Sequence, residues 1–322
     1  DNSRSGSTPV EVSANPVKLW QANLTGELTA PVIAGGKVIV AQKEKHIVTA
    51  LDAAAGRQLW SFTAGGRIDS PPTISAGMVA FGSHDGYVYC LRISDGQMIW
   101  RFRAAPDDKR TVAFGQLESV WPVVGSVSVV GNTLYCVAGR SSYLDGGMAL
   151  YRLDLATGSE IGKTPLYSRD PVTGAQPEEL IEDAEMPGAL PDILTIEGES
   201  MFLRDNHFDL SGNQRKGDYK PHLYSSAGLL NADWWARTYW IYGERSFGRA
   251  SAWNLASKYR PSGKLLAVDG PLVYGYDFRG THKLFCMDRD VKKVNEPLRE
   301  QPDREQNRHS GIAKYLTPDK VL

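Results

Sequence analysis

Two stretches of this sequence repeat the same phrase forty residues apart. The stretch "ALDAAAGRQLW" ends at Trp60 and "CLRISDGQMIW" ends at Trp100, while an earlier tryptophan, Trp20, lies forty residues before Trp60. Each phrase joins a small residue and an apolar residue to a polar turn with glycine, and then closes on tryptophan. Periods of about 20–50 residues are typical of repeat architectures. The chain is therefore predicted to contain several copies of one structural unit.

The unit between these tryptophans has the pattern of a four-stranded antiparallel sheet. Three short runs rich in Val, Ile and Tyr precede each closing tryptophan, with Gly- or Asp-containing turns between them, and a fourth run carries the tryptophan. Four strands in about forty residues are the size of a β-propeller blade, whereas a β-sandwich, the alternative, requires no regular tryptophan spacing. The repeated turn and closing positions are Trp20, Asp52, Gly56, Trp60, Gly96, Trp100, Asp154 and Gly158.

Weaker copies continue along the chain, so we predict an all-β propeller with about six blades. The blades lie near residues 26–60, 66–100, 118–161, 190–215, 221–260 and 262–290, and the fifth is degenerate. About 22 extra residues, mostly "APDDKRTVAFGQLESVWP", separate the second and third units. The propeller domain is predicted over residues 1–290, followed by a charged linker or extended tail over 291–322. Rings commonly have about 4–8 blades. Five clear blades and one degenerate one, followed by last residues without a closing motif, would leave the ring open or short, so we expect an incomplete ring with further blades from the same protein or a second chain.

Composition excludes several functional classes. Lys plus Arg is 36 and Asp plus Glu is 37, so the net charge of −1 lacks the basic excess of a nucleic-acid-binding protein. No apolar run approaches the roughly 18 residues that predict a transmembrane helix. The opening residues, "DNSRSGSTPVEVSANP", lack the apolar core of a signal peptide. Nucleic acid and a membrane span are therefore not expected.

The repeated phrase resembles the tryptophan-docking repeat of PQQ-like β-propellers. That group includes pyrroloquinoline-quinone (PQQ) dehydrogenases and the lipoprotein propeller of the outer-membrane assembly machinery. The stretches "DNSRSG", "GGRIDSPPT", "AFGQLESVWPV", "AGRSSYLDGG" and "WWARTYWIYG" together are similar to bacterial PQQ-binding-like propeller repeat proteins. The resemblance implies a PQQ-like propeller with a periplasmic or extracellular location. It predicts the fold far more specifically than the function, because propellers host many activities.

The cysteines do not fit a redox centre. Cys90 and Cys286 take the repeat position of Ala50, and Cys136 takes that of Ala41, so all three are predicted to be small packed strand residues, with a disulfide as the alternative. The adjacent cysteine pair of quinoprotein alcohol dehydrogenases is absent, as are haem and zinc cysteine motifs. Nucleophile-elbow and phosphate-loop motifs are also missing. We expect no cofactor and no metal, and PQQ or Ca²⁺ is disfavoured.

Candidate binding residues lie where the repeat is interrupted. Glu118, in the insertion, could face the propeller axis and bind a cation or hydroxyl groups, or be a solvated residue at a strand start. Arg140 and Asp145 form either a ligand site or a loop clamp. His207 lies among charged residues, with Arg204 on the opposite strand face. His84 is interpreted as a solvated turn residue.

An aromatic segment supplies the other candidates. The stretch "NADWWARTYWIYG" combines aromatic rings with charged groups, which suits sugar binding, or else plugs a junction between blades. Its candidate residues are Asp233, Trp234, Trp235 and Arg237. If these segments converge, replacing Trp235 or Glu118 by alanine is expected to lower binding while thermal stability barely changes.

Three functions remain open. The first, which the sequence favours, is a non-catalytic binding scaffold within a larger protein or assembly. The second is a carbohydrate-binding or carbohydrate-active propeller with a polysaccharide partner, for which paired carboxylates would be needed for catalysis. The third is a PQQ-dependent dehydrogenase, which the missing motifs disfavour.

Overall fold

The computed structural model describes residues 5–8, 10–11, 13, 15–170, 172–175, 189–204, 206–215, 221–225, 240–243, 262–263, 265–276 and 284–288. Regular structure in these ranges is β-strand, apart from one turn of 3-10 helix, η1 (Lys43–Lys45). The strands form small antiparallel sheets, which confirms the all-β prediction. Within the same ranges, no helix has the length and apolar character needed to cross a membrane.

Three sheets have the predicted four strands in chain order, and we call them blades 1, 2 and 3. Blade 1 consists of β1 (Val32–Ala34), β2 (Lys37–Gln42), β3 (Ile47–Asp52) and β4 (Gln58–Thr63). Blade 2 consists of β5 (Thr73–Ser75), β6 (Met78–Gly82), β7 (Tyr87–Arg92) and β8 (Met98–Arg103). Blade 3 consists of β11 (Ser128–Val130), β12 (Thr133–Ala138), β13 (Met148–Asp154) and β14 (Glu160–Leu166).

Three further sheets have three described strands each, and we call them blades 4, 5 and 6. Blade 4 consists of β15 (Thr195–Glu197), β16 (Ser200–Leu203) and β17 (Asn206–Asp209). Blade 5 consists of β18 (His222–Ser225), β19 (Trp240–Gly243) and β20 (Ser262–Gly263). Blade 6 consists of β21 (Leu266–Asp269), β22 (Leu272–Tyr276) and β23 (Leu284–Asp288).

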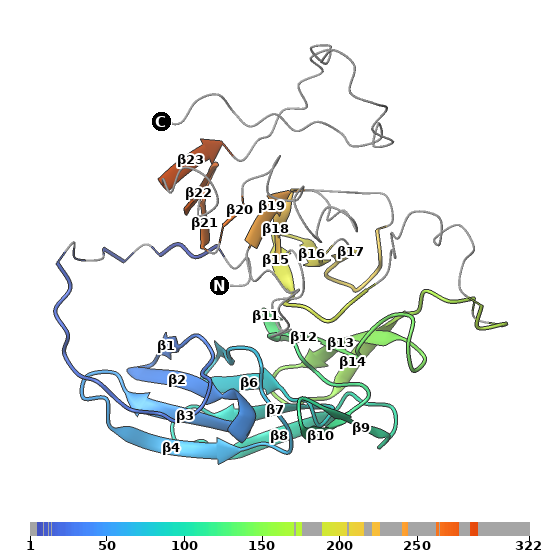
Figure 1. Ribbon diagram of the computed structural model, residues 1–322, viewed down its shortest axis with the longest axis horizontal. Coiled ribbons are helices and arrows are strands. Elements are labelled where there is room, and N and C mark those ends of the chain that lie inside the picture. The colour runs from blue at the N-terminus through green and yellow to red at the C-terminus, as the bar shows by residue number, and fades with distance from the viewer. Residues whose placement is uncertain are drawn as a thin grey trace, which may run out of the picture.

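The sheets follow one another as the blades of a propeller (Figure 1). The first strand of blade 2, β5, contacts the first strands of blades 1 and 3, β1 and β11, and the first strand of blade 4, β15, contacts that of blade 5, β18. The predicted insertion between blades 2 and 3 contains a separate two-stranded sheet, made of β9 (Arg110–Ala113) and β10 (Gln116–Ser119). Glu118 therefore lies in this hairpin and not in the first strand of blade 3.

The hydrophobic core lies between adjacent blades, so each inner blade buries both of its faces. Val79 and Phe81 of β6 pack against blade 1, whereas Ala80, on the opposite face of the same strand, packs against blade 3. This explains why β6 and β7 read as nearly continuous apolar runs. Cys90 and Cys136 are buried in one of these layers and are unbonded, as predicted for packed small residues. Burial raises the pKa of the Cys90 thiol to about 12.

The repeated tryptophans join blade 1 to blade 2 and blade 2 to blade 3. The indole N–H of Trp60 donates to Ile93 O at 3.0 Å, and that of Trp100 donates to Leu155 O at 2.9 Å. Trp20 makes the same kind of contact with blade 1, donating to Ala53 O at 2.9 Å. Each indole also lies against the turn glycine of the blade that receives it. Those glycines are Gly56, Gly96 and Gly158, with φ of 68°, 73° and 72°.

Blade 3 lacks a closing tryptophan, and an arginine takes its place. Gly162 on β14 pairs with Arg152, as Trp100 pairs with Cys90 in blade 2. A Cβ on Gly162 would meet Arg152 Nη2 at 2.2 Å. The Arg152 side chain therefore covers the position that an indole fills in the preceding blades, which explains why the repeat weakens here.

The contact between Trp60 and Gly96 can be tested with a matched pair of glycines. Gly96 and Gly77 have φ of 73° and 74°, but a Cβ on Gly96 would meet Trp60 Cδ2 at 2.6 Å, whereas nothing lies within 4 Å at Gly77. Both Gly→Ala changes should cost about 1–2 kcal/mol through left-handed backbone strain. Gly96→Ala should cost a further ~1–3 kcal/mol because the indole must move. Equal losses in urea unfolding would contradict this contact.

Candidate functional site

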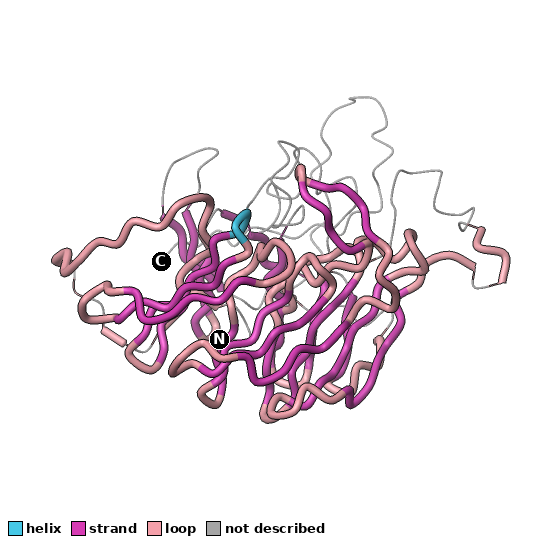
Figure 2. Tube along the Cα trace, turned by 90° about the horizontal axis from the view of Figure 1, so that it is seen from below, coloured by secondary structure: helices cyan, strands magenta, loops and turns pink. Residues whose placement is uncertain are grey.

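Four segments meet at one end of blades 1 and 2. They are 43–46, which contains η1; 64–72, which joins β4 to β5; 83–86, between β6 and β7; and 104–127, which contains β9 and β10. Because antiparallel strands alternate in direction, these turns and connections all lie at the same end of the sheets. We call this end the loop face. Figure 2 shows η1 in cyan and a projecting pair of strands on the same side of the molecule.

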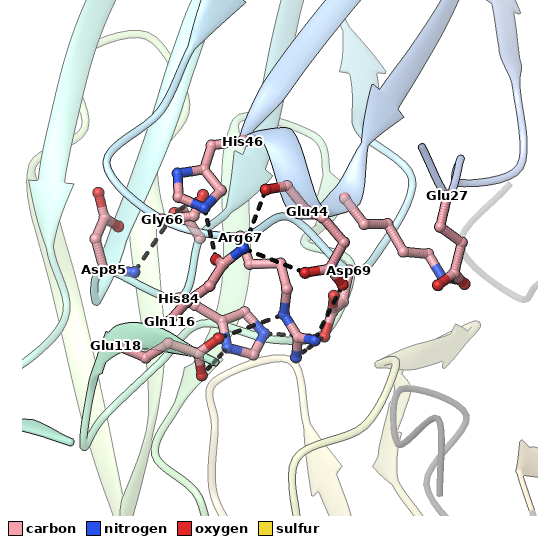
Figure 3. A network of polar contacts seen from close by, with 12 residues as sticks. Glu27, Glu44, His46, Gly66, Arg67, Asp69, His84, Asp85, Gln116 and Glu118 are labelled. Atoms are coloured by element: carbon pink, nitrogen blue, oxygen red, sulfur yellow. Dashed lines mark hydrogen bonds and ion pairs between the residues drawn. The ribbon is translucent and has the colours of Figure 1, made fainter. Parts of the chain in front are cut away.

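Four charged side chains meet on the loop face (Figure 3), and almost no part of them is exposed to solvent. We call Arg67, Asp69, His84 and Glu118 the charged network; their relative exposures are 4%, 8%, 3% and 4%. Arg67 Nη2 lies 2.9 Å from Asp69 Oδ2, and Arg67 Nε lies 3.4 Å from Glu118 Oε1. Buried charges are tolerated when they are paired, and here two basic groups face two carboxylates.

His84 lies between the two carboxylates of the charged network. Its Nε2 is 3.0 Å from Asp69 Oδ2 and its Nδ1 is 2.7 Å from Glu118 Oε2. Burial alone lowers the pKa of His84, but hydrogen bonds and charge attraction from Asp69 and Glu118 outweigh burial, so the pKa is raised above its usual value. The arrangement suits a protonated imidazolium that donates both ring N–H groups.

Two glycines allow the chain to bring these groups together. A Cβ on Gly65 would meet Asp85 Oδ2 at 2.3 Å, and one on Gly66 would meet Asp85 N at 2.5 Å. Only glycine permits segment 64–72 to lie so close to turn 83–86. The backbone N–H of His84 then donates to Arg67 O at 2.9 Å, which places the two basic residues side by side.

The β9–β10 hairpin covers the charged network with its polar face. Glu118 contacts His84 as described above, and the backbone N–H of Ser119 donates to His84 O at 2.8 Å. Gln116 reaches blade 1, where its Oε1 lies 2.7 Å from His46 Nε2. At the hairpin tip, the Phe114 ring lies over the guanidinium of Arg67, with its centroid 3.7 Å from Cζ. The hairpin thus links blades 1 and 2 across the loop face.

The other face of the hairpin carries two apolar residues that are exposed to solvent. Val112 and Leu117 are directly paired across the two strands, and they are 75% and 58% exposed. The tip residues Phe114 and Gly115 have φ of 51° and 72°, the positive values typical of a tight two-residue hairpin turn. A hairpin normally buries its apolar face, so this one has the reverse orientation. We call Val112 and Leu117 the apolar pair.

Two of the predicted site residues, Glu118 and Arg140, lie in or beside the insertion but in different surroundings. Glu118 is buried in the charged network, so the solvated alternative is wrong. We therefore expect Glu118→Ala to lower stability, contrary to the expectation of an unchanged melting temperature. Arg140 forms an ion pair within its own loop, with Nη2 2.5 Å from Asp145 Oδ2. The indole of Trp121, which follows β10, donates to Asp145 O at 2.9 Å and ties that loop to the insertion.

Arg204 and His207 belong to blade 4. His207 is 3% exposed, and its ring stacks on Phe202 with centroids 4.7 Å apart. Arg204 has φ of 52°, and its Nε lies 4.0 Å from Asp192 Oδ2. Glu118 is thus the one predicted residue that the described structure places in the charged network. Asp233, Trp234, Trp235 and Arg237 lie outside the described residues, so the sugar-binding hypothesis for them stays a prediction.

Sequence reasoning missed three members of the charged network. His84 occupies the predicted hairpin turn, but it is buried, so its interpretation as a solvated residue was wrong. Arg67 and Asp69 were not singled out, although they lie in the distinctive stretch "GGRIDSPPT". The two glycines that precede Arg67 are the sequence feature that could have indicated the network, because consecutive glycines allow two backbone segments to lie close together.

Comparison with known proteins places the chain among the PQQ-like repeat propellers. Residues 12–185, just over half of the chain, match the profile of the family described as "Outer membrane protein assembly factor BamB". The chain belongs to this family. The matched residues include blades 1–3 and the β9–β10 hairpin.

Two curated relatives have the same description. The protein from Nitrosomonas eutropha is 31% identical over 96 residues, which cover 29% of this chain and 23% of the relative. The protein from Burkholderia pseudomallei is 29% identical over 153 residues, which cover 46% of this chain and 35% of the relative. The matched part of the chain therefore spans about a third or less of the length of either relative.

Solved propeller structures are also similar. BamB from Moraxella catarrhalis is 14% identical with a TM-score of 0.49, and the match covers 84% of this chain and 74% of that one. Quinohemoprotein alcohol dehydrogenase from Comamonas testosteroni is 15% identical with a TM-score of 0.46, covering 82% of this chain and 42% of that one.

The charged network does not fit a cation site such as the Ca²⁺ of a quinone enzyme. Ca²⁺ takes about 6–8 oxygen ligands, whereas the carboxylates of Asp69 and Glu118 already face His84 and Arg67. In the part of the chain that the structure describes, no group of three or more His, Cys, Asp or Glu side chains could hold a metal ion. The expectation that the protein needs no cofactor stays a prediction.

Proposed function

We propose that this protein is a non-catalytic propeller that binds a protein component of an outer-membrane assembly machinery in the periplasm. Membership of the family described as "Outer membrane protein assembly factor BamB" supports this class of partner and this location. The charged side chains of the loop face are buried and paired with one another, so they are not available to bind a small substrate. A polypeptide partner that contacts the surface therefore suits the loop face better.

The observation that carries the proposal is the apolar pair. Val112 and Leu117 are exposed, while their neighbours Gln116 and Glu118 face the protein interior. Exposing apolar side chains to water is unfavourable, by roughly 25 cal/mol per Å², and a partner that covers them recovers this free energy. Apolar anchors held on a rigid element are typical of protein interfaces, because little conformational entropy is lost on binding.

The proposal predicts that charge at the apolar pair abolishes partner binding without unfolding the protein. In the bacterium that encodes this protein, the double variant Val112→Asp/Leu117→Asp should bind the assembly machinery at least about tenfold more weakly. The amount of outer-membrane proteins should fall as far as it does when the gene is deleted. Both readouts use the full-length protein.

Met98→Asp is the matched control, because Met98 is an apolar residue on β8 that is 51% exposed. It should leave partner binding and outer-membrane protein amounts unchanged. All variants should unfold at the urea concentration of the wild type. If the double variant supports normal outer-membrane protein amounts, or if deletion of the gene has no effect on them, the proposed function is wrong.

A further inference from the structure

His84 joins two segments that are far apart in the sequence. It contacts Asp69 in segment 64–72 and Glu118 on the β9–β10 hairpin, at 3.0 Å and 2.7 Å. A neutral imidazole has one N–H donor and one acceptor nitrogen, so it can donate to only one of these carboxylates. Its acceptor nitrogen would then face a carboxylate oxygen, which is repulsive. Only the imidazolium satisfies both contacts.

The other charged groups around His84 are balanced only when His84 is protonated. The guanidinium group of arginine carries a positive charge in proteins, and that of Arg67 contacts both Asp69 and Glu118. Glu44 on η1 approaches Arg67 from the solvent side at 3.5 Å, and Asp85 follows His84 in its own turn. With His84 protonated, two cations balance the two carboxylates of the charged network. Without that proton, one cation faces two buried anions.

We propose that protonated His84 is a positioning residue that holds the β9–β10 hairpin on the loop face, and that the hairpin loosens as His84 loses its proton. The contacts between His84, Glu118 and the backbone of Ser119 are the described links from hairpin to turn 83–86. The consequence for binding rests on the proposed function, since the apolar pair is on this hairpin. Partner affinity is then lower at alkaline pH.

The direction follows from the contact with Glu118, which raises the pKa of His84 and is present only while the hairpin is closed. A group with a raised pKa contributes its full stabilisation below its ordinary pKa of about 6.5. That stabilisation is lost as the pH rises through the higher value of the closed state. The hairpin is therefore held most firmly while His84 is protonated, and it is released at more alkaline pH.

Amide hydrogen exchange tests this inference without any partner. Protection factors for residues 110–119 of the full protein should fall between about pH 6 and pH 9, after correction for intrinsic exchange. The protection factors should fall about tenfold for each unit by which the contact with Glu118 raises the pKa of His84. Amides of β3 should keep constant protection, and the His84 imidazole signals in NMR spectra should titrate over the same interval.

Two variants distinguish positioning from general packing. His84→Gln should leave residues 110–119 poorly protected at every pH, with no remaining pH response. His46→Gln, which removes the other histidine that contacts the hairpin, should keep the full response. Constant protection of wild-type residues 110–119 would overturn the inference, as would a pH response that survives in His84→Gln. Because exchange needs no partner, either result is independent of whether the proposed function holds.

Discussion

Replacement of Arg67 by alanine is expected to cost about 3–5 kcal/mol of unfolding free energy. The change leaves the carboxylates of Asp69 and Glu118 buried, with only His84 to balance them. It also removes the guanidinium on which the Phe114 ring lies. Urea unfolding followed by circular dichroism measures the loss, which should appear as a lower midpoint.

The control for Arg67→Ala is Arg92→Ala. Arg92 forms an ion pair with Asp95 at 2.8 Å, but their side chains are 51% and 42% exposed. Exposed pairs contribute about 0–1 kcal/mol, so this variant should unfold almost as the wild type does. Similar losses for the two arginines would show that the charged network is not buried as described.

The second large effect is expected from Trp100→Ala, at about 3–5 kcal/mol. The indole is 9% exposed, packs on Gly158 and donates to Leu155 O, so its removal leaves a cavity between blades 2 and 3. Met98→Ala on the same strand truncates a side chain that is 51% exposed and should change stability by no more than about 0.5 kcal/mol. A loss below about 1 kcal/mol for Trp100→Ala would contradict the tryptophan contacts between blades.

The blades could be predicted because their signals are local. A turn glycine with positive φ, such as Gly96, and the tryptophan that packs on it recur at a fixed spacing, so the repeat is visible in the sequence. The four-stranded pattern follows from the same spacing. Where Gly162 and Arg152 replace the tryptophan contact, the repeat became harder to recognise.

The charged network could not be predicted in the same way, because its members come from separate turns. Arg67, His84 and Glu118 meet only after blades 1 and 2 have packed and the insertion has folded over them. Taken alone, "SHDG" has the composition of a solvated turn. Burial of its histidine depends on a hairpin that begins more than twenty residues later. Long-range contacts of this kind leave no periodic pattern.

The orientation of the β9–β10 hairpin could not be predicted from the sequence either, because it also depends on contacts with distant segments. Strand alternation in "RTVAFGQLES" places Val112 and Leu117 on one face and Glu118 on the other, but it does not say which face is buried. The usual rule would bury the apolar face. The buried basic groups of Arg67 and His84 reverse that preference, because they need the Glu118 carboxylate.

Under the proposed function, the β9–β10 hairpin presents the apolar pair to a protein of the outer-membrane assembly machinery. Site-specific photocrosslinking in living cells can capture this contact, with a photoreactive amino acid at position 117 of the full-length protein and the same probe at position 98 as the control. We expect position 117 to form an adduct, identified by mass spectrometry as an outer-membrane assembly component, and position 98 to form none. Adducts of that component from position 98 alone, or from neither position, would show that the apolar pair does not bind this machinery.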